Sequence, residues 1–283
     1  MGKASQTASI PDGYDAPEFW DLAFSDETIP EADFIEAVLQ KFGPTSLPDS
    51  RPKSSSPARI LEIACGGGRQ VIELAIRGHH VTAFDLNERC IEYVTQRLRR
   101  KKLDADLFIG DMTSFRVKEQ FDLAHCLVNS FRHLISEADA VAHLNCVTSA
   151  LKPGGLYLLG LHLLPPDAAE DDCERWTIHS GKTRVTTTIR VLDFNRRTRI
   201  ETVRFSLKVT RPTGVLRFQA DHRLRIYRAD QMRSLLKKVP ELELIGVYDF
   251  NYDLEEPRKL DDELGDTVLV LKKTGRVTSA VNF

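Results

Sequence analysis

The stretch that most constrains the fold is residues 60–69, which read Ile-Leu-Glu-Ile-Ala-Cys-Gly-Gly-Gly-Arg. The apolar run 60–63 predicts a buried strand, and the small residues 64–68 predict a tight turn after it. Apolar positions at Val71 and Leu74 predict a helix directly after the turn. Small residues let a ligand approach the backbone, and the free N–H groups of a helix N-terminus point toward it. The pattern therefore predicts a nucleotide-binding corner.

The glycine spacing narrows the class of ligand. A dinucleotide-binding fingerprint needs glycine at its first, third and sixth positions. Counted from Gly66, the third position is Gly68 but the sixth is Val71, and counted from Ala64, the sixth is Arg69. The glycine that allows close packing of helix and strand in dinucleotide sites is missing. An NAD-dependent dehydrogenase is therefore disfavoured.

Length and composition set outer limits. The 283 residues suffice for one large domain or a domain with an insertion, and the 42% hydrophobic content fits a globular protein. The net charge of −2 gives no overall attraction to nucleic acid or membrane. The five cysteines form no Cys-x-x-Cys pair, so we expect reduced thiols and a cytoplasmic protein. No apolar run approaches the ~18 residues of a membrane span, and no residue spacing indicates a metal site.

Apolar runs and helical patterns alternate through the middle of the chain. Strands are expected at 60–63, 80–84, 106–109, 121–128 and 156–163, the last after a Lys-Pro-Gly-Gly turn at 152–155. Helices are expected over 31–42, from Val71 to near Gly78, over 88–101 and over 137–151, the last with Ser136 as N-cap. Buried strands joined by helices predict a parallel sheet covered on both faces.

The pattern changes to a period of two between Trp176 and Tyr227, which predicts an antiparallel meander with one wet face. A helix over 229–239 and strands over 242–248 and 267–272 follow. We expect three parts: an N-terminal segment and linker (1–58) that covers the ligand site, a core (59–165 and 229–273), and an inserted antiparallel sheet (166–228) that serves as a lid or an oligomerisation surface. Residues 1–12, 43–58 and 274–283 are expected to be loose.

The run at 60–68 resembles the first motif of class I S-adenosylmethionine-dependent methyltransferases: apolar and acidic residues, then small-x-Gly-x-Gly. Ala64 stands where most members have glycine, and alanine is also found at this position in glycine N-methyltransferase-like members. The resemblance covers roughly residues 14–273 and is motif-specific mainly over 60–163. It implies a Rossmann-like, seven-stranded, doubly wound α/β sheet whose final strand is antiparallel. It also implies S-adenosyl-L-methionine as cofactor and S-adenosyl-L-homocysteine as product.

Acidic residues at the predicted strand ends extend this resemblance. Asp85 follows Gly68 by seventeen residues, where a carboxylate can accept hydrogen bonds from both ribose hydroxyls; a helix N-cap is the alternative. In the family's pattern, Asp111 would bind the adenine amino group and Met112 would pack on the adenine ring. The alternative for these two residues is an ordinary turn at the end of a strand. The cofactor-binding residues that the resemblance implies are Tyr14, Trp20, Glu62, Ala64, Cys65, Gly66, Gly68, Asp85, Leu86, Asp111, Met112 and Leu127.

Three of these assignments rest on chemistry as well as on the resemblance. Glu62 supports the turn or the cofactor's ammonium in the family, and a buried carboxylate needs some partner. Tyr14 and Trp20 lie in a segment that folds over the cofactor in glycine N-methyltransferase-like enzymes, and a π face suits a positive sulfur. Simple docking of the N-terminal segment is equally open for both aromatic residues.

The methyl-acceptor residues are the least specific part of the prediction. Asn129, after the fourth strand, and His133 and His162, near strand ends, could face the acceptor. Helix capping by Asn129 or Ser130 is the alternative, and a histidine in a strand, such as His125, is more often a satisfied core residue. No catalytic acid–base pair stands out, which is compatible with in-line displacement from an already activated cofactor.

The predicted function is methyl transfer to a nitrogen or oxygen of a small molecule. Residues 182–228 carry 13 Lys and Arg but 3 Asp and Glu, so an RNA methyltransferase that uses this basic insertion is an alternative. A solvated sheet face is the simpler interpretation, since aromatic stacking residues are scarce there. A catalytically inactive S-adenosylmethionine-binding protein is a further alternative. Nucleic acid is thus an unexpected partner, and a homo-oligomer through the inserted sheet is possible.

Overall fold

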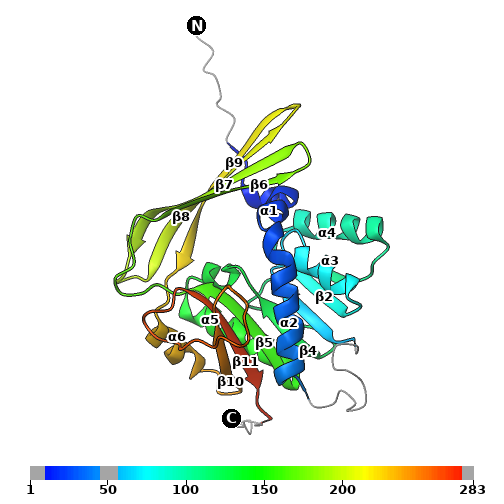
Figure 1. The fold of residues 1–283 in the computed structure, drawn as a ribbon. Coiled ribbons are helices and arrows are strands. Elements are labelled where there is room, and N and C mark those ends of the chain that lie inside the picture. The colour runs from blue at the N-terminus through cyan, green and yellow to red at the C-terminus, as the bar shows by residue number, and fades with distance from the viewer. Residues whose placement is uncertain (1–9, 45–56, 276–283) are drawn as a thin grey trace.

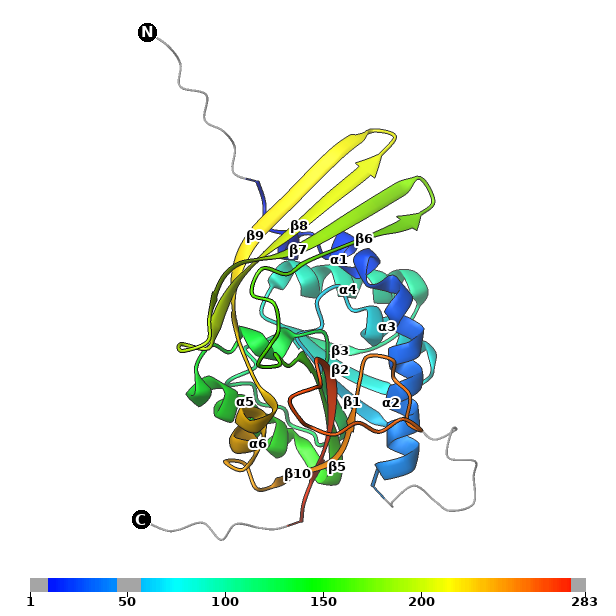
Figure 2. The same cartoon turned by 60° about the vertical axis from the view of Figure 1, so that its left-hand side comes forward.

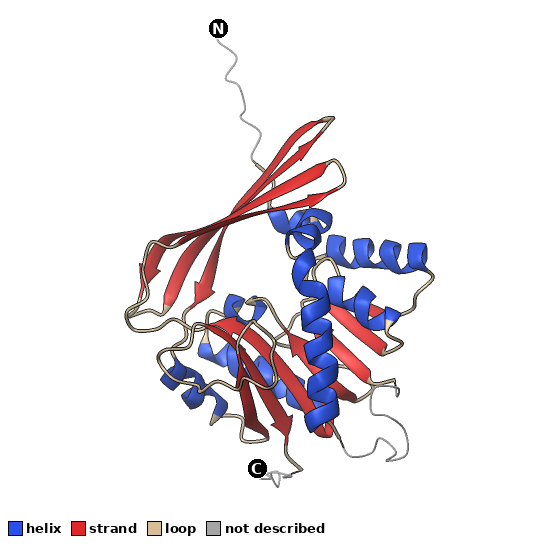
Figure 3. Cartoon of the chain, in the orientation of Figure 1, coloured by secondary structure: helices blue, strands red, loops and turns tan. Residues whose placement is uncertain are grey.

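A computed structural model describes residues 10–44 and 57–275 (Figure 1). The expectations for residues 1–9, 45–56 and 276–283 concern segments outside the described residues. Figure 3 shows a helix-covered sheet with a second, separate sheet above it. The helices are α1 (Pro17–Ala23), α2 (Thr28–Phe42), α3 (Arg69–Ile76), α4 (Glu88–Lys101), α5 (Glu137–Ala150) and α6 (Ala229–Leu236), with short 3-10 turns η1 (Gly13–Asp15), η2 (Ser25–Glu27) and η4 (Ser130–His133).

The larger sheet has seven strands in the order β10-β11-β5-β4-β1-β2-β3. They are β1 (Arg59–Ile63), β2 (His80–Asp85), β3 (Asp106–Ile109), β4 (Phe121–Cys126), β5 (Leu151–His162), β10 (Leu242–Tyr248) and β11 (Asp266–Lys273). The first five strands pair in parallel, and β11 runs antiparallel to both β5 and β10. The predicted doubly wound, seven-stranded sheet with an antiparallel final strand is confirmed.

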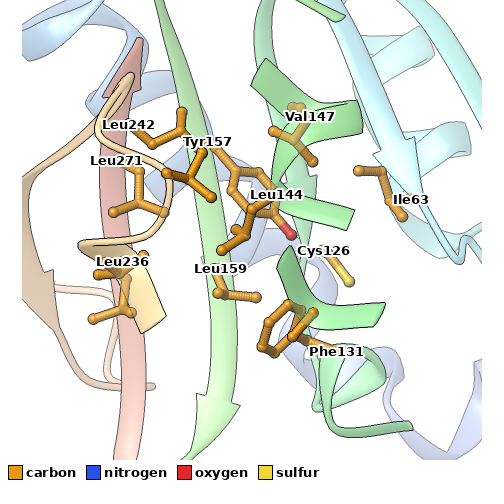
Figure 4. Packing of buried hydrophobic residues seen from close by; sticks show 14 of the residues in the cluster. Ile63, Cys126, Phe131, Leu144, Val147, Tyr157, Leu159, Leu236, Leu242 and Leu271 are labelled. Carbon is orange, nitrogen blue, oxygen red and sulfur yellow. The ribbon is translucent and has the colours of Figure 1, made fainter. Parts of the chain in front are cut away.

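Two apolar clusters cover the two faces of this sheet. On one face, α5 and α6 pack around the buried Tyr157, as Figure 4 shows with Leu144 and Leu236 nearby. On the other face, α2, α3 and α4 pack on β1 and β2 through residues such as Val38 and Val94. The spacing of apolar residues in the sequence predicted each of these helices. The covered faces leave only the strand ends open, which positions the site there.

Local signals explain several element boundaries. The Ser136 hydroxyl accepts the Asp139 backbone N–H at 3.0 Å, so the predicted N-cap of α5 is confirmed. The expected turn before β5 is wrong in one respect, because β5 begins at Leu151, which pairs with Phe121. The residues between Leu151 and Leu156 form an irregularity within the strand, and this absorbs the Lys-Pro-Gly-Gly signal.

The second sheet has four antiparallel strands in the order β6-β7-β8-β9 (Figure 2). They are β6 (Cys173–Ser180), β7 (Thr183–Asn195), β8 (Ile200–Arg211) and β9 (Gly214–Arg225). The predicted meander after the fifth strand is therefore present. Arg225 departs from the expected exposed alternation, because it is buried at the end of β9.

The N-terminal segment lies between the two sheets. Phe19 and Ala23 of α1 pack against Val185, Leu207 and Val209 of the inserted sheet. The other side of α1 contacts the core, because Arg97 of α4 pairs with its Asp21 at 2.7 Å. The segment thus joins the core and the inserted sheet, which also meet where η4 contacts β9. No helix in the described part of the chain is long and apolar enough to cross a membrane.

Candidate active site

The glycine turn combines tight packing with an open side. Gly68 has φ +70° and a Cβ there would lie 2.5 Å from the Val94 side chain. A Cβ on Gly67 would meet Asp21 at 2.7 Å. Gly66 has φ +51°, but a Cβ there would meet nothing within 4 Å. Glycine is therefore required at 67 and 68 by the protein's own packing, whereas at 66 the space beside the backbone is free for a ligand.

Asp85 ends β2 beside this turn. Its Oδ2 accepts the Gly66 N–H at 2.8 Å and its Oδ1 accepts the Asn87 N–H at 2.9 Å. Burial raises the pKa of Asp85, and these backbone hydrogen bonds oppose the rise. Asn87 serves as N-cap of α4, because its side chain accepts the Arg89 N–H at 3.0 Å. Asp85 therefore braces the glycine turn and does not cap the helix.

A cavity of about 1300 Å³ lies along the strand ends, between the core and the inserted sheet. The predicted site residues that line it are Tyr14, Trp20, Glu62, Ala64, Cys65, Gly66, Asp85, Leu86, Asp111, Met112, Leu127, Asn129, His133 and His162. Gly68 does not line it and acts through backbone conformation and packing. Leu86 presents its side chain openly, with 73% exposed.

The inner wall of the cavity holds unpaired polar atoms. Glu62 and His125 are register partners on β1 and β4, and Glu62 Oε2 and His125 Nε2 have no hydrogen-bonding partner among the described residues. Arg69 Nη1 and Gln70 Oε1 are likewise buried and unpaired within the described chain. Burial raises the pKa of Glu62 to about 8 and lowers the pKa of His125 to about 3. At neutral pH both groups are therefore mostly uncharged.

A buried cluster that the sequence did not predict supports this wall. Glu31 of α2 is 0% exposed and accepts from Arg69 at 2.6 Å, from Gln70 at 2.7 Å and from the Tyr252 hydroxyl at 3.1 Å. The helical pattern placed Glu31 at a helix start, but no local signal shows that it meets residues 38 to 221 positions away. This cluster fixes the direction of Arg69.

Asp111 and Met112 follow β3. The Asp111 Oδ1 accepts from the backbone and hydroxyl of Thr113, both at 2.8 Å. The Met112 carbonyl lies 3.0 Å from His143 Nδ1, and His143 Nε2 lies 2.6 Å from the Tyr157 hydroxyl. Because a carbonyl only accepts, Nδ1 carries the proton and Nε2 accepts from Tyr157. The loop after β3 is thus tied to the core behind it.

Aromatic rings form the opposite side of the cavity. The Tyr14 hydroxyl lies 3.2 Å from His133 Nε2, and the Tyr14 ring lies 5.3 Å from Trp20 and 6.0 Å from Phe205. Burial, with the nearby positive groups His222 and Arg132, lowers the pKa of His133 to about 4. The structure therefore brings the predicted residues 14, 20 and 133 together.

Asn129 and His162 form a second pair. Asn129 Oδ1 accepts the His162 backbone N–H at 2.7 Å, and His162 Nδ1 lies 2.6 Å from Asp266 Oδ1. The Asn129 side chain is thus partly used within the protein, and its amide nitrogen is left for other contacts. His133, which lines the same cavity, interacts with Tyr14 and not with this pair.

The charge of the cavity lining is strongly one-sided. Among the described residues, fourteen Asp and Glu line it, against two Arg and no Lys. The two arginines, Arg69 and Arg132, are each paired with a carboxylate, Glu31 and Glu201. The lining therefore favours positively charged ligands.

Comparisons with known proteins agree with this geometry. A family model described as a methyltransferase domain matches residues 60–155. The chain is 25% identical over 182 residues to a dTDP-3-amino-3,6-dideoxy-alpha-D-glucopyranose N,N-dimethyltransferase of Streptomyces fradiae, covering 64% of this chain and 69% of that protein. It is 27% identical to glycine N-methyltransferase of Rattus norvegicus, covering 56% of each.

A solved S-adenosylmethionine-dependent methyltransferase from Clostridium acetobutylicum shares the fold. Its TM-score is 0.70 at 18% identity, over 92% of this chain and 98% of that one. The glycine turn, the strand order and the matched family model point to the same conclusion. Residues 60–155 thus match a methyltransferase domain, and the chain has the fold of S-adenosylmethionine-dependent methyltransferases.

Proposed function

We propose that this protein transfers a methyl group from S-adenosylmethionine to an amine nitrogen of a small molecule. The observation that carries the proposal is the pair of unpaired atoms Glu62 Oε2 and Arg69 Nη1 in one cavity wall. The amino acid end of the cofactor has one ammonium and one carboxylate. A buried acceptor and a buried donor that have no partners among residues 10–44 and 57–275 are complementary to these two groups.

The remaining cofactor contacts follow along the strand ends. Gly66 leaves free space beside the turn, which suits close approach of a ligand to the backbone. We assign Asp85, which lines the cavity, to the ribose hydroxyls, and Asp111 and Met112, which also line it, to the base. We assign Leu86, Cys65 and Leu127 to the walls between these points.

The bound cofactor supplies a methyl group on a positively charged sulfur. The residues of this chain align the acceptor and keep water out. With a pKa of about 4, His133 is neutral at pH 7, and its Nε2 lies 3.2 Å from the Tyr14 hydroxyl. So weak a base does not hold a removed proton at neutral pH, and burial raises the pKa of Tyr14. An acceptor that binds as an ammonium therefore passes its proton to water, and the neutral amine then attacks.

Charge and aromatic surface favour an amine as the acceptor. The lining carries fourteen carboxylates, and Trp20, Phe24 and Trp176 add aromatic faces. Carboxylates attract an ammonium group, and aromatic faces stabilise it. The names of the Streptomyces fradiae and rat relatives describe transfer to nitrogen, in the first case on an amino sugar. An amino sugar is therefore the first acceptor to test.

Replacing Asp85 by alanine is expected to weaken binding of S-adenosylhomocysteine. The loss of a hydrogen-bonding carboxylate corresponds to about 1.5–3 kcal/mol, or roughly 10- to 150-fold in Kd. Isothermal titration calorimetry measures it, with the exposed Glu92→Gln on α4 as control. Unchanged affinity in Asp85→Ala would remove the ribose assignment.

Binding of S-adenosylhomocysteine at pH 7 is expected to release close to one proton. The raised pKa of Glu62, about 8, means that its carboxyl is mostly protonated in the free protein at pH 7. A bound ammonium favours the ionised form and lowers this pKa, so the proton leaves. Calorimetry in buffers of different ionisation enthalpy counts the protons. Release should vanish in Glu62→Gln and fade above about pH 9, and undiminished release in that variant would contradict the assignment.

Two alternatives remain open to experiment. An RNA methyltransferase would be expected to need the exposed Arg184, Arg190 and Arg217. Arg184 and Arg190 alternate with Val185 and Ile189, and Arg217 precedes Phe218; these apolar residues face α1 or the cavity. Full amine methylation by the triple glutamine variant would argue against RNA. A cofactor-binding protein without activity would bind S-adenosylhomocysteine but methylate no amine.

Light scattering tests whether the protein forms an oligomer through the inserted sheet.

A further inference from the structure

The loop between β4 and α5 holds two neighbouring residues in the left-handed conformation. Val128 has φ +56° and Asn129 has φ +66°. This conformation is unfavourable for residues with a Cβ, most of all for a β-branched valine. Such a conformation persists only where surrounding contacts fix it. The contacts of this loop therefore determine the cavity floor, where Asn129 and His133 lie.

Contacts to the core fix one end of the loop. The Asn129 side chain accepts the His162 N–H at 2.7 Å, and the Asn129 N–H donates to the Gly160 carbonyl at 3.3 Å. The Arg132 N–H donates to the Asn129 carbonyl at 2.9 Å and starts η4. These bonds hold residue 129 against β5.

Contacts to the inserted sheet fix the other end. The Arg132 guanidinium pairs with Glu201 of β8, and its Nε donates to the Arg225 carbonyl of β9 at 3.0 Å. In return, Arg225 Nη1 donates to the Ile135 carbonyl at 2.5 Å. Arg132 and Glu201 are each 4% exposed. A buried charge without its partner is costly, so the pair strongly favours one relative position of loop and sheet.

We propose that Arg132 and Glu201 are positioning residues, which hold the loop 127–133 at a set distance below the inserted sheet. Val203 and Phe205 follow Glu201 at alternate positions of β8 and line the cavity. Tyr14 joins the two sides, with ring centroids 5.8 Å from His133 and 6.0 Å from Phe205. The proposal deepens the proposed function, because it rests on this cavity being the site of methyl transfer.

The decisive variant is Glu201→Gln, which keeps the shape of the side chain and the charge of Arg132. If the loop stays in place, the unneutralised Arg132 lowers the pKa of His133 further below its value of about 4. If the loop is released, His133 meets water and its pKa rises toward ~6.5. The groups that act on His133 are Arg132, His222, Asp12 and the Tyr14 hydroxyl. We expect the rise, measured by NMR titration of the histidine rings.

A second variant separates positioning from folding stability. The double replacement Arg132→Met and Glu201→Leu removes both charges, which proteins often tolerate without loss of stability. Hydrogen exchange over residues 127–135 is expected to be at least tenfold faster in this variant, with exchange in β1 and β2 unchanged. The control is Asp221→Asn, which removes the charge from Asp221 of β9 in its exposed 2.7 Å pair with Arg204 of β8. It should leave loop exchange unchanged.

The two measurements are made with and without S-adenosylhomocysteine. A further fall in the His133 pKa, or loop exchange that matches wild type in the double variant, overturns the positioning role. Failure of the wild type to bind S-adenosylhomocysteine would instead count against the proposed function. Exchange that rises throughout the chain would show general destabilisation and also overturn the proposal.

Discussion

Replacing Glu31 by alanine is expected to remove about 3–5 kcal/mol from the free energy of unfolding. The carboxylate is completely buried and faces Arg69, Gln70 and Tyr252. Its loss leaves the Arg69 guanidinium without its negative partner in a place that water reaches poorly. Urea denaturation at pH 7, followed by circular dichroism, measures the change.

A matched control lies on the same helix. Glu36 of α2 pairs with Arg77 at 2.6 Å, but its side chain is 37% exposed. Glu36→Ala is therefore expected to cost about 0.2–1 kcal/mol. Glu31→Gln keeps an acceptor and should fall between the two. Similar losses in Glu31→Ala and Glu36→Ala would show that the buried cluster has no special weight.

Alanine at Gly68 is expected to lower mainly the stability of the protein, whereas alanine at Gly66 is expected to lower mainly the affinity for the cofactor. In Gly68→Ala, the new methyl meets Val94 at 2.5 Å in a left-handed backbone. The two costs together amount to about 2–5 kcal/mol of stability. In Gly66→Ala, only the backbone cost of about 1–2 kcal/mol applies, because a methyl there meets no atom of the described residues within 4 Å.

The affinity for S-adenosylhomocysteine should fall more in Gly66→Ala than in Gly68→Ala. Gly66 lines the cavity, so its methyl takes space that we assign to the cofactor, and we expect at least a tenfold rise in Kd. Thermal unfolding and calorimetry on the same samples separate the two effects. Val94→Ala should restore part of the stability lost in Gly68→Ala. Equal stability loss at both glycines would show that the contact with Val94 is not the cause.

The sequence predicted the parts of the site that depend on neighbouring residues. The glycine turn, Asp85 and the Ser136 cap each follow from a local pattern in which a few adjacent residues determine the backbone. The meander after the fifth strand followed from its period of two. Such features are set by short-range sterics and hydrogen bonds, which sequence alone can reveal.

The parts that were missed depend on residues far apart in the chain. Glu31 meets Tyr252 across 221 positions, and Arg132 meets Glu201 across 69. The sequence does not show whether a charged residue is buried or exposed, so Arg225 was expected on a solvent-exposed face. Positive φ at Val128 was equally hidden, because valine itself disfavours that conformation and tertiary contacts impose it.

The position of α1 between the core and the inserted sheet also bears on how the protein is made. During synthesis, α1 leaves the ribosome about 160–190 residues before Val185, Leu207 and Val209, the side chains it packs against. At typical elongation speeds that gap lasts roughly ten to forty seconds. The face of α1 that carries Phe19 and Ala23 stays uncovered until the sheet-forming segments arrive. We therefore expect the nucleotide corner to form early and the covered pocket to be completed last, so that nascent chains acquire their ligand-binding shape only near the end of translation.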